Sequence, residues 1–350
     1  MLNRIIRMAA ALAGCILFAT GCIRTGSLDT DHETIRFTVG SLLLRDDATK
    51  GTLKEGSEFT TGDSFLAWAW HSAAAQQFTF GTESKVTLGS NGLWDYAPHL
   101  PWNWKDGADS YDFLAIYPGN KPVMPSSPTQ PYNQYLLKAS VAYDATVDQY
   151  DLMAAGYRRT DKSIAPVHLE FSHLLSAVSV EVKNAAGSVD NLGQPLTITL
   201  KSCQFVNLVK EANISVTFDR NSLAVQWPGN ISETPVLGPT IPENKTLAPD
   251  ASFPTTDVWD LMVPQDLDPT GGALPPTLQI VYNKGDGSDI SQTVTLKDIT
   301  KQGTNEAITK WEAGVQYHYL IELRIGVGIV VTVTTTPWEV VEAETPGLMI

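Results

Sequence analysis

The sequence predicts an all-β protein built from antiparallel β-sandwiches. Short runs rich in Val, Ile, Thr and aromatic residues recur along its 350 residues, each bounded by Gly, Pro, Asn or Asp. Helical periodicity is weak, and residues 147–155 are the best candidate for a short helix. A chain of this length can bury two hydrophobic cores. We therefore expect two tandem domains, residues 34–163 and 164–350, divided where the polar stretch 157–166 lacks apolar alternation.

The N-terminal residues 1–21 have the composition of a bacterial secretion signal. Two arginines precede an apolar run that is too short to span a bilayer as an ordinary helix. The run ends in Ala-Thr-Gly followed by Cys22, which resembles a lipoprotein cleavage box. We expect acylation of Cys22, including palmitate, and a polar tether over residues 22–33. The alternative is a plain signal peptide that is cleaved nearby. The acylated protein would be an outer-membrane lipoprotein at the cell surface.

Charge and cysteine content restrict the partners of the mature chain. Removal of Arg4 and Arg7 with the signal leaves 22 basic residues against 38 acidic ones, a net charge of −16. A protein with this net negative charge repels nucleic-acid phosphates and anionic lipid head groups, which argues against nucleic acid as a partner. Apart from Cys22, the mature chain retains one cysteine, Cys203, which has no partner for an internal disulfide. We expect Cys203 to be a small buried hydrophobic residue.

The predicted strands follow one another along the whole chain. The first covers residues 34–44, where Ile35, Phe37 and Val39 share one face, as in a half-buried strand. The segment Lys-Gly-Asp-Gly at 284–287 predicts a hairpin turn. Further strands are predicted at residues 63–71, 86–88, 111–117, 168–183, 196–208, 214–218, 223–227, 257–263, 277–282, 291–296, 317–325 and 329–333.

Catalytic and metal-binding motifs are absent from the sequence. His168 and His173 are five residues apart on one predicted strand, so they point to opposite faces and cannot share a metal. The chain has no Gly-x-Ser-x-Gly, His-Glu-x-x-His or phosphate-loop motif. Residues 286–289 contain two aspartates but lack the full ligand set of a calcium loop. We therefore expect no enzyme activity, no metal and no cofactor.

Two pairs of tryptophans leave a second hypothesis open. Trp68 and Trp70 share one strand face, as do Trp102 and Trp104. Paired aromatic rings can stack on sugars, so Trp102 and Trp104 are candidate residues for a surface-anchored glycan-binding lipoprotein. The alternative, which we favour for Trp68 and Trp70, is that the rings belong to the core of the first domain.

Five segments resemble motifs of the fimbrillin family, the Mfa-like group of type V pilins and their anchors or tips. They are Phe-Thr-Thr-Gly-Asp at 59–63, Tyr-Asp-Phe-Leu-Ala-Ile-Tyr-Pro at 111–118, the pair 151–155 and 169–180, Leu-Met-Val-Pro-Gln at 261–265, and residues 311–319. The resemblance covers roughly residues 34–341, which is nearly the whole mature chain. The resemblance implies transthyretin-like β-sandwich domains, export as a lipoprotein, and assembly with other fimbrial subunits into adhesive surface fimbriae that contact a host or glycan ligand.

The resemblance also implies assembly by proteolysis and strand exchange. In this family a trypsin-like protease cuts after a basic residue beyond the first strand, and a strand of the next subunit fills the groove that opens. Arg45 is the first candidate for the cut and Lys50 the second; the alternative is that they are ordinary loop residues. The candidate donor strand carries Ile325, Val327, Ile329, Val331 and Val333 on one face. Its alternatives are a plain final strand, or two short donor segments separated by Pro337. A shaft, anchor or tip role remains open.

Overall fold

The all-β prediction is confirmed. The computed structural model of the chain describes residues 35–39, 59–71, 85–96, 109–125, 136–160, 165–190, 192–233, 238, 241–243, 245–254, 258–270, 273–304, 306–324 and 328–337. These residues form five β-sheets and one short 3₁₀ turn, η2 (Leu296–Asp298). Across these ranges no helix is long and apolar enough to cross a membrane.

The helix predicted at residues 147–155 is wrong. Residues 145–147 form a turn, and the second part of the predicted helix lies in a strand, β8 (Met153–Arg159). The Asp144 carboxylate accepts hydrogen bonds from the Thr146 backbone N–H and hydroxyl at 2.8 and 2.7 Å. Asp148 accepts another from the Asp144 N–H at 3.0 Å. These local side-chain bonds satisfy the backbone in a turn and compete with a helix.

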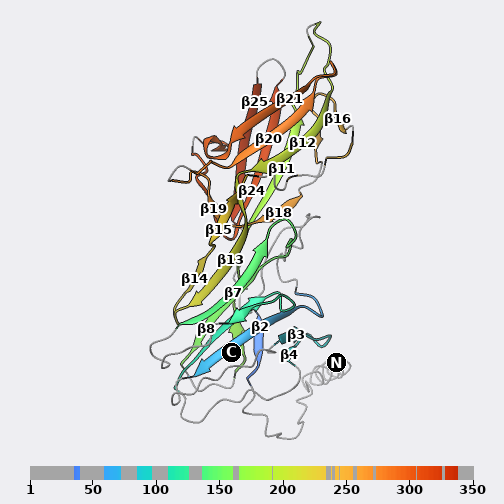
Figure 1. Ribbon diagram of the computed structural model, residues 1–350. Coiled ribbons are helices and arrows are strands. Elements are labelled where there is room, and N and C mark those ends of the chain that lie inside the picture. Colours follow the sequence, from blue (N-terminus) through green and yellow to red (C-terminus); the bar gives the residue numbers. More distant parts are fainter. Residues whose placement is uncertain are drawn as a thin grey trace, which may run out of the picture.

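One eight-stranded sheet forms the lower part of the elongated molecule in Figure 1. Its central strands β2, β5 and β8 are antiparallel neighbours, and every residue of β5 is buried. Alternate side chains therefore supply two cores on opposite faces. The order is β10-β8-β5-β2-β3-β4-β1-β9, with bounds β1 (Phe37–Val39), β2 (Ser64–His71), β3 (Lys85–Leu88), β4 (Trp94–Tyr96), β5 (Tyr111–Tyr117), β9 (Val167–Leu169) and β10 (Ser172–His173).

The two faces of the central strands carry different side chains. The side chains on one face form a cluster that we term the inner core. This cluster is aromatic and includes Phe65, Phe113 and Tyr117. The opposite face, which carries Trp68 and Trp70, joins the larger core of the molecule. Both tryptophans are buried, so the prediction that they are core residues is confirmed.

A second sheet covers the outer face of β2, β5 and β8. It contains β7 (Leu137–Asp144), which pairs over eight residues with β13 (Leu208–Phe218), about 70 residues later in the chain. Gly156 on β8 admits the Phe218 ring, which a Cβ at this position would strike. The other strands are β6 (Met124–Pro125), β14 (Leu223–Gln226) and β15 (Gly229–Ser232). This second sheet therefore contains strands from before and after residue 163. The domain boundary at residue 163 stays a prediction.

The upper part of Figure 1 contains two further sheets and a ribbon. The ring contact of Phe205 on β12 (Ile198–Val206) with Tyr319 on β24 (Val315–Arg324), at 6.0 Å between centroids, joins the two sheets. Phe205 also contacts Trp311 of the ribbon at 5.5 Å. The first sheet contains β11 (Ser176–Asn184), β17 (Ser252–Phe253), β18 (Trp259–Met262), β22 (Thr300–Lys301), β24 (Val315–Arg324) and β25 (Gly328–Pro337). The second contains β12 (Ile198–Val206), β16 (Lys245–Leu247), β20 (Thr277–Asn283) and β21 (Asp289–Thr295), and the ribbon pairs β19 (Gln265–Asp266) with β23 (Lys310–Trp311).

Two local predictions for this upper part are confirmed, and one strand prediction that reaches into the eight-stranded sheet is wrong. Cys203 is a buried free cysteine, and burial raises the pKa of its thiol well above the usual range. Residues 284–287 join β20 to β21 as an antiparallel hairpin, with Gly285 and Gly287 at positive φ. The strand predicted over residues 168–183 is instead three strands, β9, β10 and β11, so His168 and His173 lie on different strands.

A buried carboxylate joins the eight-stranded sheet to the second sheet. Asp112 lies on β5 with a side chain only 2% exposed. Its two oxygens face Arg158 Nε on the neighbouring strand β8 at 3.8 Å and Arg220 Nε at 3.3 Å. Arg220 belongs to the turn between β13 and β14 and has a positive φ of 78°. The pairing offsets the cost of burying a charge between two layers.

We expect Asp112→Asn to lower the free energy of unfolding by about 3 kcal/mol, because Arg220 and Arg158 lose the buried carboxylate that faces both of them. Urea denaturation, followed by tryptophan fluorescence, measures the change. Asp268→Asn is the matched control, since Asp268 pairs with Lys297 at 2.7 Å but is 58% exposed; its cost should stay below about 1 kcal/mol. Equal shifts of the two midpoints would contradict the role of Asp112.

Candidate functional site

The first strand, β1, lies inside the eight-stranded sheet, between two other strands. Phe37 is the antiparallel partner of Trp94 in β4. On the other side, residues 37–39 run parallel to Val167–Leu169 of β9. The backbone N–H of Val167 donates to the carbonyl of Arg36 at 2.7 Å. Removal of β1 would therefore leave unpaired strand edges on both sides of a gap.

The side chains of this strand alternate between the inner core and the surface, as the sequence predicts. Ile35 and Phe37 are buried, whereas Arg36 and Thr38 are exposed. The Phe37 ring makes edge-on contacts with Phe65 and Phe113 at centroid distances of 5.8 and 6.1 Å. Tyr96 donates its hydroxyl proton to the Ile35 carbonyl at 3.1 Å. The strand thus fills an aromatic pocket by two alternate side chains.

The chain returns to the same core after the segment that follows β1. Phe59 contacts the rings of Trp94 and Tyr117 at 5.3 and 5.4 Å. Asp63 accepts a hydrogen bond from the Tyr117 hydroxyl at 3.2 Å. Burial, with the nearby Asp63 charge, raises the pKa of Tyr117, which keeps the proton on this hydroxyl. The conspicuous Phe-x-x-Gly-Asp segment is therefore an anchor for the chain at the inner core.

Several predicted site residues lie outside the described residues. They are Cys22, Arg45, Lys50, Trp102, Trp104, Ile325 and Val327. The two ends of the segment that contains Arg45 and Lys50, however, are fixed at Val39 and Phe59. A cut within residues 40–58 would therefore separate β1 from the rest of the inner core without breaking any described strand.

The predicted donor strand coincides with β25 over residues 328–333. In this structure β25 pairs with β24 along ten residues and with β22 on its other side. Val333 is fully buried, and Ile329 and Val331 pack against the same core. The one-sided pattern thus places these three side chains inward in their own subunit.

The histidines that the structure describes do not assemble a metal site. His173 on β10 forms a buried pair with Asp151, with 2.9 Å between Nδ1 and Oδ1. His318 contacts Ser179 and Glu181 on the neighbouring strand, at 2.8 and 3.4 Å. Within the described ranges, no group of three or more His, Cys, Asp or Glu side chains is arranged to hold a metal ion.

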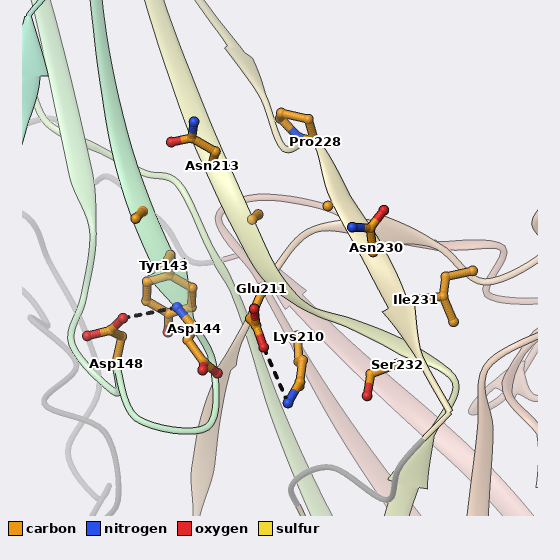
Figure 2. Close-up of a pocket in the computed structure, with 13 residues that line it drawn as sticks. Tyr143, Asp144, Asp148, Lys210, Glu211, Asn213, Pro228, Asn230, Ile231 and Ser232 are labelled. Atoms are coloured by element: carbon orange, nitrogen blue, oxygen red, sulfur yellow. Dashed lines mark hydrogen bonds and ion pairs between the residues drawn. The ribbon is translucent and has the colours of Figure 1, made fainter.

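A polar hollow of about 560 Å³ lies over β7, β13 and β15 (Figure 2). Asp144 and Asp148 occupy one side, and one oxygen of each carboxylate already accepts a hydrogen bond from a backbone N–H of the turn. Lys210 and Glu211 lie between Asp144 and Ser232 and pair with each other at 3.3 Å. The carboxylates of Asp144 and Asp148 and the Lys210–Glu211 pair are therefore already engaged in contacts within the fold.

One family model matches most of the chain, in agreement with the sequence motifs. Residues 49–338 match the model of a family described as fimbrillin-like. A search of the curated proteins gave no match. Solved structures similar to this chain include a candidate cell adhesion protein from Bacteroides uniformis, with 18% identity over 86% of this chain and 99% of that chain and a TM-score of 0.47. Another is the tip fimbrial protein Mfa3 from Porphyromonas gingivalis, with 11% identity over 80% of this chain and 95% of that chain and a TM-score of 0.36.

We expect Phe37→Ala to lower the free energy of unfolding by about 3–5 kcal/mol, because it leaves a cavity between Phe65 and Phe113. Thermal or urea unfolding of the full-length chain measures the loss. Thr38→Ala is the control from the same strand, and its exposed side chain should contribute less than about 0.5 kcal/mol. If the two variants were equally stable, β1 would not be part of the folded core.

Proposed function

The chain belongs to the fimbrillin-like family, and on that premise we propose that it is a non-catalytic subunit of cell-surface fimbriae that assembles by strand exchange. The subunit acts in adhesion, as part of a polymer with copies of itself or with other fimbrial subunits. The observation that carries the proposal is the position of β1, a short strand inserted between β4 and β9 and followed by a segment with two candidate cleavage residues.

The stabilisation of β1 suits a strand that stays in the sheet while the connection after it is intact and that can leave once this connection is cut. Burial of a side chain such as Ile35 or Phe37 stabilises the fold by about 1.5–3 kcal/mol each, and the ladder bonds add to this. While residues 40–58 are intact, β1 is tethered and its effective concentration is high. After cleavage beyond Arg45, or Lys50 as second candidate, the strand is held by a few contacts only and can dissociate.

An incoming strand would then restore what β1 supplied. It would pair with the edges of β4 and β9 and place alternate apolar side chains between Phe65 and Phe113, as in β-augmentation. We propose residues 325–333 of another subunit as the donor, with Ile325, Val327, Ile329, Val331 and Val333 on the inserted face. The alternation of Ile329, Val331 and Val333 toward the core in this structure supports that assignment.

We further propose that the protein reaches the outer membrane as a lipoprotein acylated at Cys22. The support is the signal-like composition of residues 1–21 and the small residues that precede the cysteine. More than one acyl chain is needed for stable anchoring, which the lipoprotein modification would supply.

The processing step predicts the behaviour of a double variant. Arg45→Ala with Lys50→Ala should block polymer formation, because a trypsin-like protease then finds neither candidate site. Arg45→Lys with Lys50→Arg is the matched control and should still polymerise. Fibres are scored by electron microscopy, and the mature N-terminus by mass spectrometry. A control chain that begins at residue 46 or 51 supports the proposal, whereas fibres from the alanine variant would contradict it.

The lipid anchor is tested independently of assembly. Cys22→Ser should abolish incorporation of labelled palmitate and release the protein from the membrane fraction. Cys15→Ser, in the predicted signal peptide, should keep both the label and the membrane association. Palmitate labelling of the Cys22→Ser variant would show that another residue carries the lipid.

A further inference from the structure

A second hollow, which we term the proline groove, lies between β15 and the β19–β23 ribbon. Its volume is about 700 Å³, within the range of about 300–1,000 Å³ typical of binding pockets. Trp227 and Ile231 line one side, and Pro264, Pro269 and Pro276 also line it. Asp266, Lys310 and Glu312 supply its charged groups.

Hydrogen bonds of three side chains that line this groove hold its walls in place. The Gln265 side chain of β19 accepts from the Val209 N–H at 2.8 Å and donates to the Val209 carbonyl at 3.2 Å. The Trp227 indole N–H donates to the Leu174 carbonyl at 2.8 Å. Trp311 of β23 donates to the Tyr319 hydroxyl at 2.8 Å. The groove is therefore preformed, which lowers the cost of binding an apolar segment.

The last described strand ends beside the groove. Pro337, the final residue of β25, pairs with Val315 at the start of β24. Residues 310–313, just before Val315, line the groove. A proline ends the ladder here because it has no N–H to donate. The thirteen residues 338–350 follow, and they begin with Trp338, Glu339, Val340 and Val341.

We propose that the proline groove binds the chain's own C-terminal segment, residues 338–350, with Trp338 and the two valines in contact with its apolar side chains. An extended chain advances about 3.3 Å per residue, so this segment is long enough to reach across the adjacent groove. Aromatic and aliphatic side chains suit a lining of Trp, Ile and Pro. The polar hollow of Figure 2 is the poorer site, because it lacks the tryptophans and the cluster of prolines that an apolar segment would contact. This inference goes beyond the proposed function and does not depend on it.

Site-specific photo-crosslinking tests the assignment in the purified full-length protein. Benzoylphenylalanine replaces Asp266, an exposed residue at the groove, and in a control protein it replaces Asp286, an exposed residue of the β20–β21 hairpin. We expect the probe at 266 to cross-link to residues 338–350 within one chain at every protein concentration. The probe at 286 should not reach that segment. Mass spectrometry identifies the cross-linked peptides.

Variants of the segment separate apolar docking from simple proximity. Trp338→Glu with Val340→Glu should lower the cross-link yield at 266 about tenfold or more, whereas Glu344→Gln should leave it unchanged; circular dichroism checks that both fold. Three outcomes would overturn the proposal: no cross-link to residues 338–350, a yield insensitive to the glutamate variant, or cross-links only between chains that increase with concentration. The last would assign the groove to the segment of a second copy.

Discussion

The fold depends on the burial of three strands, β2, β5 and β8, on both faces. All seven residues of β5 are buried, so its alternate side chains need two separate cores. The inner core is closed with the help of β1, and the outer face is covered by the sheet of β7 and β13. Asp112 illustrates this requirement for burial. Its carboxylate is buried on the outer face, and Arg158 of the same sheet and Arg220 of the second sheet supply the compensating charge.

The same constraint gives the first strand its significance. β1 contributes few residues, but it stands between two strands and its Phe37 ring contacts both β2 and β5. Loss of β1 would expose two ladder edges and an aromatic pocket together, which is an unstable surface in water. A replacement strand of alternate apolar residues would restore both, and this explains in physical terms why proteolysis of the connection that follows β1 would drive association.

The acceptor and donor proposed here lie in different parts of an elongated body. The eight-stranded sheet with β1 occupies the lower part of Figure 1, and β25 belongs to the upper sandwich. A contact between unlike surfaces of successive copies is heterologous, and such contacts extend into open filaments unless the rotation closes a ring. The extensive pairing of β25 with β24 means that release of this strand in its own subunit carries a cost. Docking of the following residues in the proline groove would increase that cost.

The alternation of apolar residues and the turn residues in the sequence by themselves determined the all-β class and the 284–287 hairpin. They also determined the burial of Ile35, Phe37, Trp68, Trp70 and Cys203. Such patterns report which face of a strand is apolar, and local backbone preference is enough to set a tight turn. Only the tertiary structure decided that β1 inserts between β4 and β9, that β7 pairs with β13, and that Asp112 meets Arg220. These contacts join residues far apart in the chain, and their partners are chosen by packing and charge compensation, which leave no periodic signal in the sequence.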